Sequence, residues 1–137
     1  MEESSAALAA RDKAAELGVD CLSPAGAALL TLLAATLQAR NAVEVGTGTG
    51  VAAVALLTGM VPDGVLTSID VENELQLHAR GILTAAGIPS RRARLIAGSA
   101  LTVLPKLTDG AYDLVFVDGD PLEYVEYVAQ ASRLLRT

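Results

Sequence analysis

Along this chain, stretches whose apolar residues have the periodicity of a helix alternate with short apolar runs typical of strands. The pattern predicts helices and strands in regular succession. Two helical stretches come first, residues 4–17 and 23–38; Gly18 ends the first, and Pro24 occupies the first turn of the second. Strands are then predicted by four short apolar runs, residues 42–45, 65–69, 94–97 and 114–117. Further helices are predicted after these runs, at residues 51–59, 72–86, 101–107 and 121–135.

Strands that alternate with helices predict an α/β fold with a parallel sheet and helices on both of its faces. The predicted strands are nearly all apolar, which is typical of strands that are buried on both faces. We expect one domain, residues 1–137, with N-terminal helices in residues 1–40 and an α/β core in residues 41–137. Ligands of such folds bind outside the carboxyl ends of the strands.

The composition and charge of the chain argue against some classes of function. The 137 residues are 52% hydrophobic and carry a formal net charge of −6, so a broad basic surface for nucleic acid or membrane is not expected. The local basic cluster Arg91, Arg92 and Arg94 is interpreted as a solvated loop. The single cysteine, Cys21, cannot form an internal disulfide and is expected to be buried. With no signal peptide at its start, the chain is expected to be cytoplasmic.

A glycine-rich segment follows the first predicted strand, in the order Glu44, Val45, Gly46, Thr47, Gly48, Thr49, Gly50. Glycines between a strand and a helix let the backbone approach a ligand and direct free N–H groups at it. The dinucleotide fingerprint G-x-G-x-x-G requires glycine at residue 51, where this chain has Val51. A tight turn that binds nothing is the alternative.

Two further strand ends carry candidate ligand-binding residues. Asp70 ends the second strand, and a carboxylate there can accept hydrogen bonds from both hydroxyls of a ribose; alternatively, Asp70 caps the following helix. After the third strand, the small residues Gly98, Ser99 and Ala100 leave room for a flat ring such as adenine, although a helix start capped by Ser99 is equally consistent.

The fourth strand ends in a pair of acids, Asp118 and Asp120. Two carboxylates after a buried strand can hold a divalent metal, a substrate hydroxyl or an ammonium group of a ligand. A capped helix start is again the alternative. Each of these candidate sites thus falls at the carboxyl end of a predicted strand.

In combination these segments resemble the catechol/caffeoyl-CoA type of S-adenosylmethionine-dependent O-methyltransferases, and within them a group of actinobacterial members. The resemblance extends from about residue 14 to the last residue and rests on five stretches: residues 22–26, 43–50, 68–71, 95–98 and 113–120. It implies a Rossmann-like class I methyltransferase fold whose C-terminal strands are missing here. It also implies S-adenosylmethionine as cofactor and methyl transfer to a hydroxyl of a small molecule.

The resemblance assigns roles to residues of this chain. Cofactor binding is implied for Leu22, Glu44, Gly46, Thr47, Gly48, Ala52, Asp70, Val71, Gly98, Ala100 and Asp120. Within this set, Glu44, Gly46 and Thr47 would line the methionine end, and Asp70 would bind the ribose. Asp118 would be catalytic, facing the substrate, and a divalent metal of the Mg²⁺ type at Asp118 is left open.

Three departures from the family pattern bear on function. Ala52 stands where members often carry a serine that contacts the cofactor, and Pro121 stands where many carry a lysine that assists deprotonation of the substrate. The chain also stops before a Gly-Gly turn and three further strands, which leaves the fourth strand as an edge open to pairing with another chain. We expect a homodimer. A non-catalytic cofactor-binding or assembly module and a nicotinamide oxidoreductase are the competing hypotheses.

Overall fold

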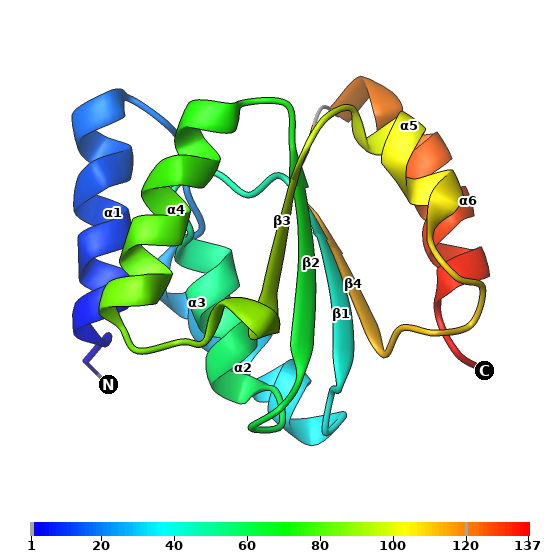
Figure 1. Cartoon of the computed structure of the whole chain (residues 1–137), viewed down its shortest axis with the longest axis horizontal. Coiled ribbons are helices and arrows are strands. Elements are labelled where there is room, and N and C mark those ends of the chain that lie inside the picture. The colour runs from blue at the N-terminus through cyan, green and yellow to red at the C-terminus, as the bar shows by residue number, and fades with distance from the viewer. Residues whose placement is uncertain (1, 120) are drawn as a thin grey trace.

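A computed structural model describes residues 2–119 and 121–137. Helices and strands alternate in the predicted order (Figure 1). The helices are α1 Ser5–Leu17, α2 Pro24–Thr36, α3 Val51–Gly59, α4 Asn73–Ala85, α5 Ala100–Val103 and α6 Tyr124–Leu134. The strands are β1 Asn41–Val45, β2 Val65–Asp70, β3 Ala93–Ala97 and β4 Leu114–Val117. Short 3₁₀ turns cover η1 Ser90–Arg92, η2 Leu104–Lys106 and η3 Pro121–Glu123.

The four strands form one parallel sheet in the order β3-β2-β1-β4. In its centre Val43 pairs with Thr67 of β2 on one side and with Val115 of β4 on the other. Helices α1 to α4 lie on one face of the sheet, and α5 and α6 lie on the other (Figure 1). The predicted α/β fold with a parallel sheet between two helical layers is therefore confirmed.

Helices α2 and α3 pack closely, because small residues face each other. Residues Val51 to Leu57 of α3 are all buried. A Cβ on Gly59 would lie 2.2 Å from the carbonyl oxygen of Thr31, so only glycine permits this approach of α3 to α2. The hydroxyl of Thr31 also donates a hydrogen bond to the carbonyl of Ala55 at 2.9 Å. This packing holds α3, and the turn before it, against the sheet.

Asp113 joins β4 to the segment before β1. Its Oδ2 accepts hydrogen bonds from the backbone N–H groups of Arg40 at 2.7 Å and Asn41 at 3.1 Å, and its Oδ1 pairs with Arg136 at 2.6 Å. Burial works against the charged form, but these N–H groups and the Arg136 guanidinium hold the pKa of Asp113 below its usual value. This carboxylate therefore stabilises the start of the edge strand.

Several predictions made for individual segments were wrong. The strands β1 and β2 are buried on both faces, but the outer strand β3 exposes Arg94 and Ala97, because it has a neighbour on one side only. Cys21 is exposed, since it lies in the loop before α2 rather than under a helix. Arg92 is half-buried rather than free in solvent: it donates hydrogen bonds to the carbonyls of Gly64, Leu57 and Val61.

The helices near the C-terminus also differ from their predictions. The segment predicted as one helix at 101–107 divides into α5 and η2, because Pro105 lies within it. The last helix begins at Tyr124 after η3 rather than at Pro121. On this helix Tyr127 and Leu134 are buried, whereas Val125 remains 80% exposed and Val128 62% exposed. Its apolar positions therefore do not all face the sheet.

Candidate functional site

The turn after β1 lies directly against the segment after β4. Gly46 has a φ of 97°, and a Cβ on it would lie 2.3 Å from the carbonyl oxygen of Asp118. The N–H of Gly46 donates to the carbonyl of Ile69 at 2.8 Å, which ties the turn to β2 as well. Gly48 has a φ of 54°, and a Cβ there would meet open space. The glycine turn thus brings the carboxyl ends of three strands together and leaves its tip accessible.

Asp70 organises this edge of the sheet. Its Oδ2 accepts a hydrogen bond from the N–H of Gly48 at 3.0 Å, and its Oδ1 accepts one from the N–H of Glu72 at 2.9 Å. Asp70 is not the cap of α4, because Glu72 holds the N-cap position. An ionised carboxylate has about four acceptor positions. Asp70 therefore keeps acceptor capacity for a ligand while it positions the glycine turn.

A hollow of about 220 Å³ opens at the carboxyl ends of the strands. Five of the residues predicted to bind cofactor line it, namely Gly46, Asp70, Val71, Gly98 and Ala100. Gly119, Glu123 and Tyr127 also line it, although no sequence motif points to Glu123 or Tyr127. The Tyr127 hydroxyl donates to the Glu123 carboxylate, and the Tyr127 ring lies 3.3 Å from where a Cβ on Gly119 would be. A helical tyrosine carries no sequence signal for such a position.

A smaller hollow of about 20 Å³ lies on the other side of the glycine turn. It is lined by five further predicted residues, Leu22, Thr47, Gly48, Ala52 and Asp118. Gly46 lines both hollows, so the two sets of residues meet at one turn. Two of the predicted cofactor-binding residues are not among these linings. Glu44 is fully buried beneath the turn, and Asp120 lies outside the described residues.

Asp118 shares the smaller hollow with Asp20, a residue of the loop before α2 to which no sequence motif points. Burial raises the pKa of Asp118, and the negative charge of Asp20 raises it further. The predicted metal at Asp118 gains no support from its surroundings. Among residues 2–119 and 121–137, no three His, Cys, Asp or Glu side chains are grouped so that they could hold a metal ion.

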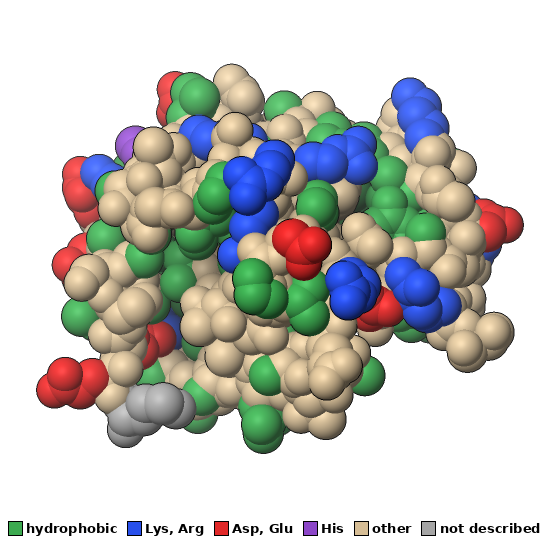
Figure 2. Space-filling model, turned by 60° about the horizontal axis from the view of Figure 1, so that its bottom comes forward, with side chains coloured by type: hydrophobic (Ala, Val, Ile, Leu, Met, Phe, Trp, Pro, Cys, Tyr) green, Lys and Arg blue, Asp and Glu red, His purple; other side chains and the backbone are tan. Residues whose placement is uncertain are grey.

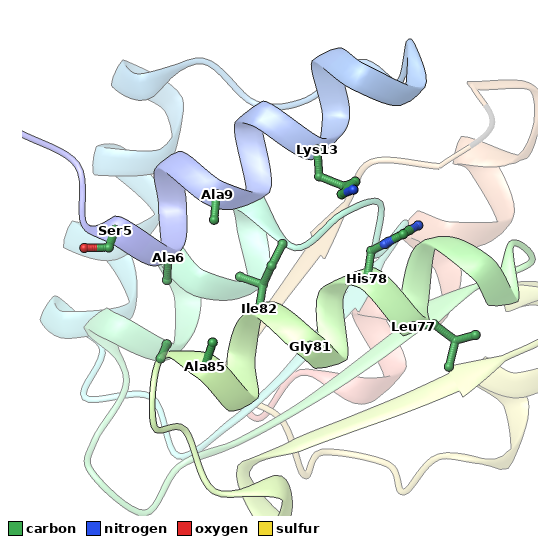
Figure 3. A pocket seen from close by; sticks show the side chains of 10 residues that line it. Ser5, Ala6, Ala9, Lys13, Leu77, His78, Gly81, Ile82 and Ala85 are labelled. Atoms are coloured by element: carbon green, nitrogen blue, oxygen red, sulfur yellow. The ribbon is translucent and has the colours of Figure 1, made fainter.

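Another groove on the surface lacks this chemistry. A groove of about 480 Å³ between α1 and α4 is formed largely by small and apolar residues, among them Ala6, Ala9 and Ile82 (Figure 3). Lys13 of α1 and His78 of α4 lie at one end of it, and Lys13 pairs with Glu16 at 3.1 Å. The groove contains none of the glycine turn or acidic residues, so it is not the candidate site.

The face at the amino ends of the strands, opposite the site, carries several Lys and Arg side chains. Figure 2 shows that face, where Lys and Arg side chains are interspersed with acidic and apolar ones. None of the helices in the described part of the chain is both long and apolar enough to cross a membrane.

Comparison with known proteins identifies the family. The profile of the O-methyltransferase family matches residues 7–137. The chain therefore belongs to the O-methyltransferase family.

Individual relatives show the same relationship. A protein from Mycobacterium sp. (strain KMS) is 47% identical over 137 residues, which are 100% of this chain and 62% of that protein. The chain thus spans about 62% of the length of this relative. A crystal structure of a Corynebacterium glutamicum protein matches with a TM-score of 0.93 at 32% identity, covering 99% of this chain and 64% of the other.

A third relative was crystallised with the cofactor that the sequence resemblance implies. The O-methyltransferase TomG from Streptomyces achromogenes, solved in complex with S-adenosylmethionine, matches with a TM-score of 0.91 at 31% identity. The match covers 98% of this chain and 62% of TomG. Nothing in these comparisons favours the alternative of a non-catalytic module.

Proposed function

We propose that this chain is the cofactor-binding part of an S-adenosylmethionine-dependent O-methyltransferase that methylates a hydroxyl group of a small molecule. The observation that carries the proposal is the convergence of the glycine turn, Asp70 and the Gly98–Ala100 segment around one hollow at the carboxyl ends of the strands. Membership of the O-methyltransferase family supports it.

The residues present fit the cofactor. Asp70 has free acceptor positions for the two ribose hydroxyls, and the Gly48 tip leaves open space beside it. Gly98 and Ala100 border the same hollow and lack bulky side chains, which suits a flat base. Leu22, Thr47 and Ala52 lie on the opposite side of Gly46, where we place the methionine end.

Asp118 is proposed as the residue that faces the substrate. The methyl group on a sulfonium is already activated, so the protein mainly has to align the acceptor oxygen and receive its proton. A carboxyl with a raised pKa accepts a proton more readily than an ordinary one. Asp118 therefore supplies a proton acceptor at a site where Pro121 replaces the lysine of many relatives.

We also propose that the protein forms a homodimer and resides in the cytoplasm. The apolar positions exposed on α6 support self-association. Analytical ultracentrifugation across a concentration series tests the homodimer, and a monomer at all concentrations would contradict it.

Calorimetric titration with S-adenosylmethionine tests the proposed function. Asp70→Ala removes both ribose acceptors and is expected to weaken binding by about 10–100-fold, because hydrogen bonds to a charged group contribute about 1.5–3 kcal/mol. Asp63→Ala, an exposed acid in the turn before β2, is the matched control and should bind like wild type. Binding of NAD in place of S-adenosylmethionine, or binding by Asp70→Ala that equals wild type, would overturn the assignment.

A further inference from the structure

One carboxyl group beneath the candidate site, that of Glu44, is buried without a positive charge or a full set of hydrogen bonds. Glu44 lies in the middle of the sheet and is 0% exposed. Its Oε1 accepts a hydrogen bond at 2.6 Å from the hydroxyl of Ser68, its partner on β2. Its Oε2 is buried and has no hydrogen-bond partner among the described residues. An ionised carboxylate in such a place has a high desolvation cost.

A chain of side-chain hydrogen bonds leads from Gln76 through Thr47 and Ser68 to Glu44, and each donor in it points toward Glu44. The side-chain amide of Gln76 donates to Thr47 Oγ1 at 3.2 Å and to the carbonyl of Ile96 at 2.9 Å. Ser68 gives its single hydrogen to Glu44, so in the 2.6 Å contact between the two hydroxyls Thr47 must be the donor. The chain therefore ends at Oε1, and it contains no further hydrogen for Oε2.

The charges that surround Glu44 are negative. Asp70 at the end of β2 and Asp118 after β4 both act on it, while α4 contributes the uncharged Gln76. Asp20 in turn faces Asp118. No ion pair within residues 2–119 and 121–137 includes any of these four acids.

The protonation of Glu44 follows from this environment. Burial raises the pKa of Glu44 to about 8; the Ser68 hydrogen bond opposes the rise, and the charges of Asp118 and Asp70 add to it. At neutral pH the carboxyl is thus mostly protonated. With Oε1 already accepting from Ser68, the proton belongs on Oε2, which removes the unpaired charge.

We propose that Glu44 is protonated in the ligand-free domain and releases this proton when the positively charged cofactor binds at the adjoining glycine turn. The proposal rests on the proposed function above. S-adenosylmethionine carries a sulfonium, and a positive charge near Glu44 favours its ionised form. After methyl transfer the sulfonium is a neutral thioether, so the product favours ionisation less. Glu44 thereby makes the site favour the charged cofactor over the neutral product, and this preference depends on pH.

The direction in which pH changes the affinity for S-adenosylmethionine follows from the coupling between ligand binding and proton release. A ligand that favours the ionised form binds more tightly as pH rises toward the pKa of the free protein, with a limit of about tenfold in Kd per pH unit. Above that pKa the affinity levels off. S-adenosylhomocysteine should show a weaker dependence over the same range, because it lacks the sulfonium charge.

Calorimetry in two buffers of different ionisation enthalpy counts the protons released on binding. At about pH 7, wild type should release up to one proton with S-adenosylmethionine and fewer with S-adenosylhomocysteine. Glu44→Gln keeps the side-chain shape and removes the proton, so it should release none and bind with little pH dependence. Glu74→Gln, an exposed acid in the first turn of α4, is the matched control and should behave like wild type.

Ser68→Ala provides a second variant that does not alter Glu44 itself. It removes the hydrogen bond that stabilises the carboxylate, so the midpoint of the pH dependence should move upward. Binding without proton release in wild type, or equal release in Glu44→Gln, overturns the role of Glu44 and leaves the proposed function intact. Absence of saturable S-adenosylmethionine binding to wild type overturns both.

Discussion

Helices α3 and α6 both carry apolar side chains, yet they are buried to very different extents. On α3 every residue from Val51 to Leu57 is buried between α2 and the sheet. On α6, Tyr127 and Leu134 are buried, while Val125 and Val128 remain 80% and 62% exposed. The difference shows that an apolar pattern tells which residues can be buried, whereas the neighbouring elements decide which ones are.

The sheet provides the reason for the difference. Strand β1 is paired on both sides and lies centrally, so α3 covers a surface that extends beyond it in both directions. Within the described residues, strand β4 pairs with β1 alone, so it forms one edge of the sheet, and α6 packs against it there. An apolar side chain that reaches beyond the edge meets solvent and contributes little to stability.

The largest expected effect comes from truncating a leucine in the buried region. Leu56→Ala on α3 should lower the free energy of unfolding by about 2–5 kcal/mol, because it leaves a cavity in a closely packed layer. Val125→Ala on α6 is the control and should change it by less than about 0.5 kcal/mol. Urea denaturation measures both, and comparable losses would mean that α6 is covered in solution.

A smaller loss of stability is expected from a substitution at Asp113, just before the edge strand β4. Asp113→Asn removes the charge that faces Arg136 and the N–H groups of Arg40 and Asn41, and should cost about 1–2 kcal/mol at neutral pH.

The stability difference between wild type and Asp113→Asn should depend on pH in one direction. Because the pKa of Asp113 is lowered in the folded state, its contribution is present above its usual pKa and is lost as pH falls through the folded value. Thermal unfolding of wild type and Asp113→Asn should therefore converge in acid. A difference that stays constant with pH would show that the charge of Asp113 does not contribute.

The smallest effect on stability is expected from polar substitutions on the exposed face of α6. The double variant Val125→Lys with Val128→Glu should change the free energy of unfolding by about 0.5 kcal/mol or less, since both side chains already contact solvent. It should lower concentration-dependent self-association, which sedimentation velocity measures. A large loss of stability would show that the exposed valines pack against another surface in the solution state.

Much of the fold could be predicted from the pattern of apolar residues and its interruptions. Glycines and Asp-Gly turns separate the elements, and the strand interiors are apolar enough to identify all four strands. The errors fall where long-range packing overrides the local pattern. Arg92 turned inward because three backbone carbonyls accept its hydrogen bonds, and residues 61–64 are distant from it in sequence.

The candidate site was predictable to the extent that its residues follow strands in sequence. Gly46, Gly98 and Asp118 each lie just after a strand and Asp70 is the last residue of one, and parallel strands bring such positions to one edge. Asp20 comes from a loop before the sheet and Tyr127 from the helix after it, and neither position has a local pattern.

The sequence by itself determined the α/β alternation, the glycine turn and the acids at the strand ends, because these depend on local conformational preference and strand polarity. Only the tertiary structure decided that Glu44 is fully enclosed, that Thr47, Ser68 and Gln76 direct their hydrogens toward it, and that its second oxygen is unpaired. These residues are spread over two strands, a turn and a helix. Their effect on one another arises from exclusion of water and from distance, which are properties of the packed chain.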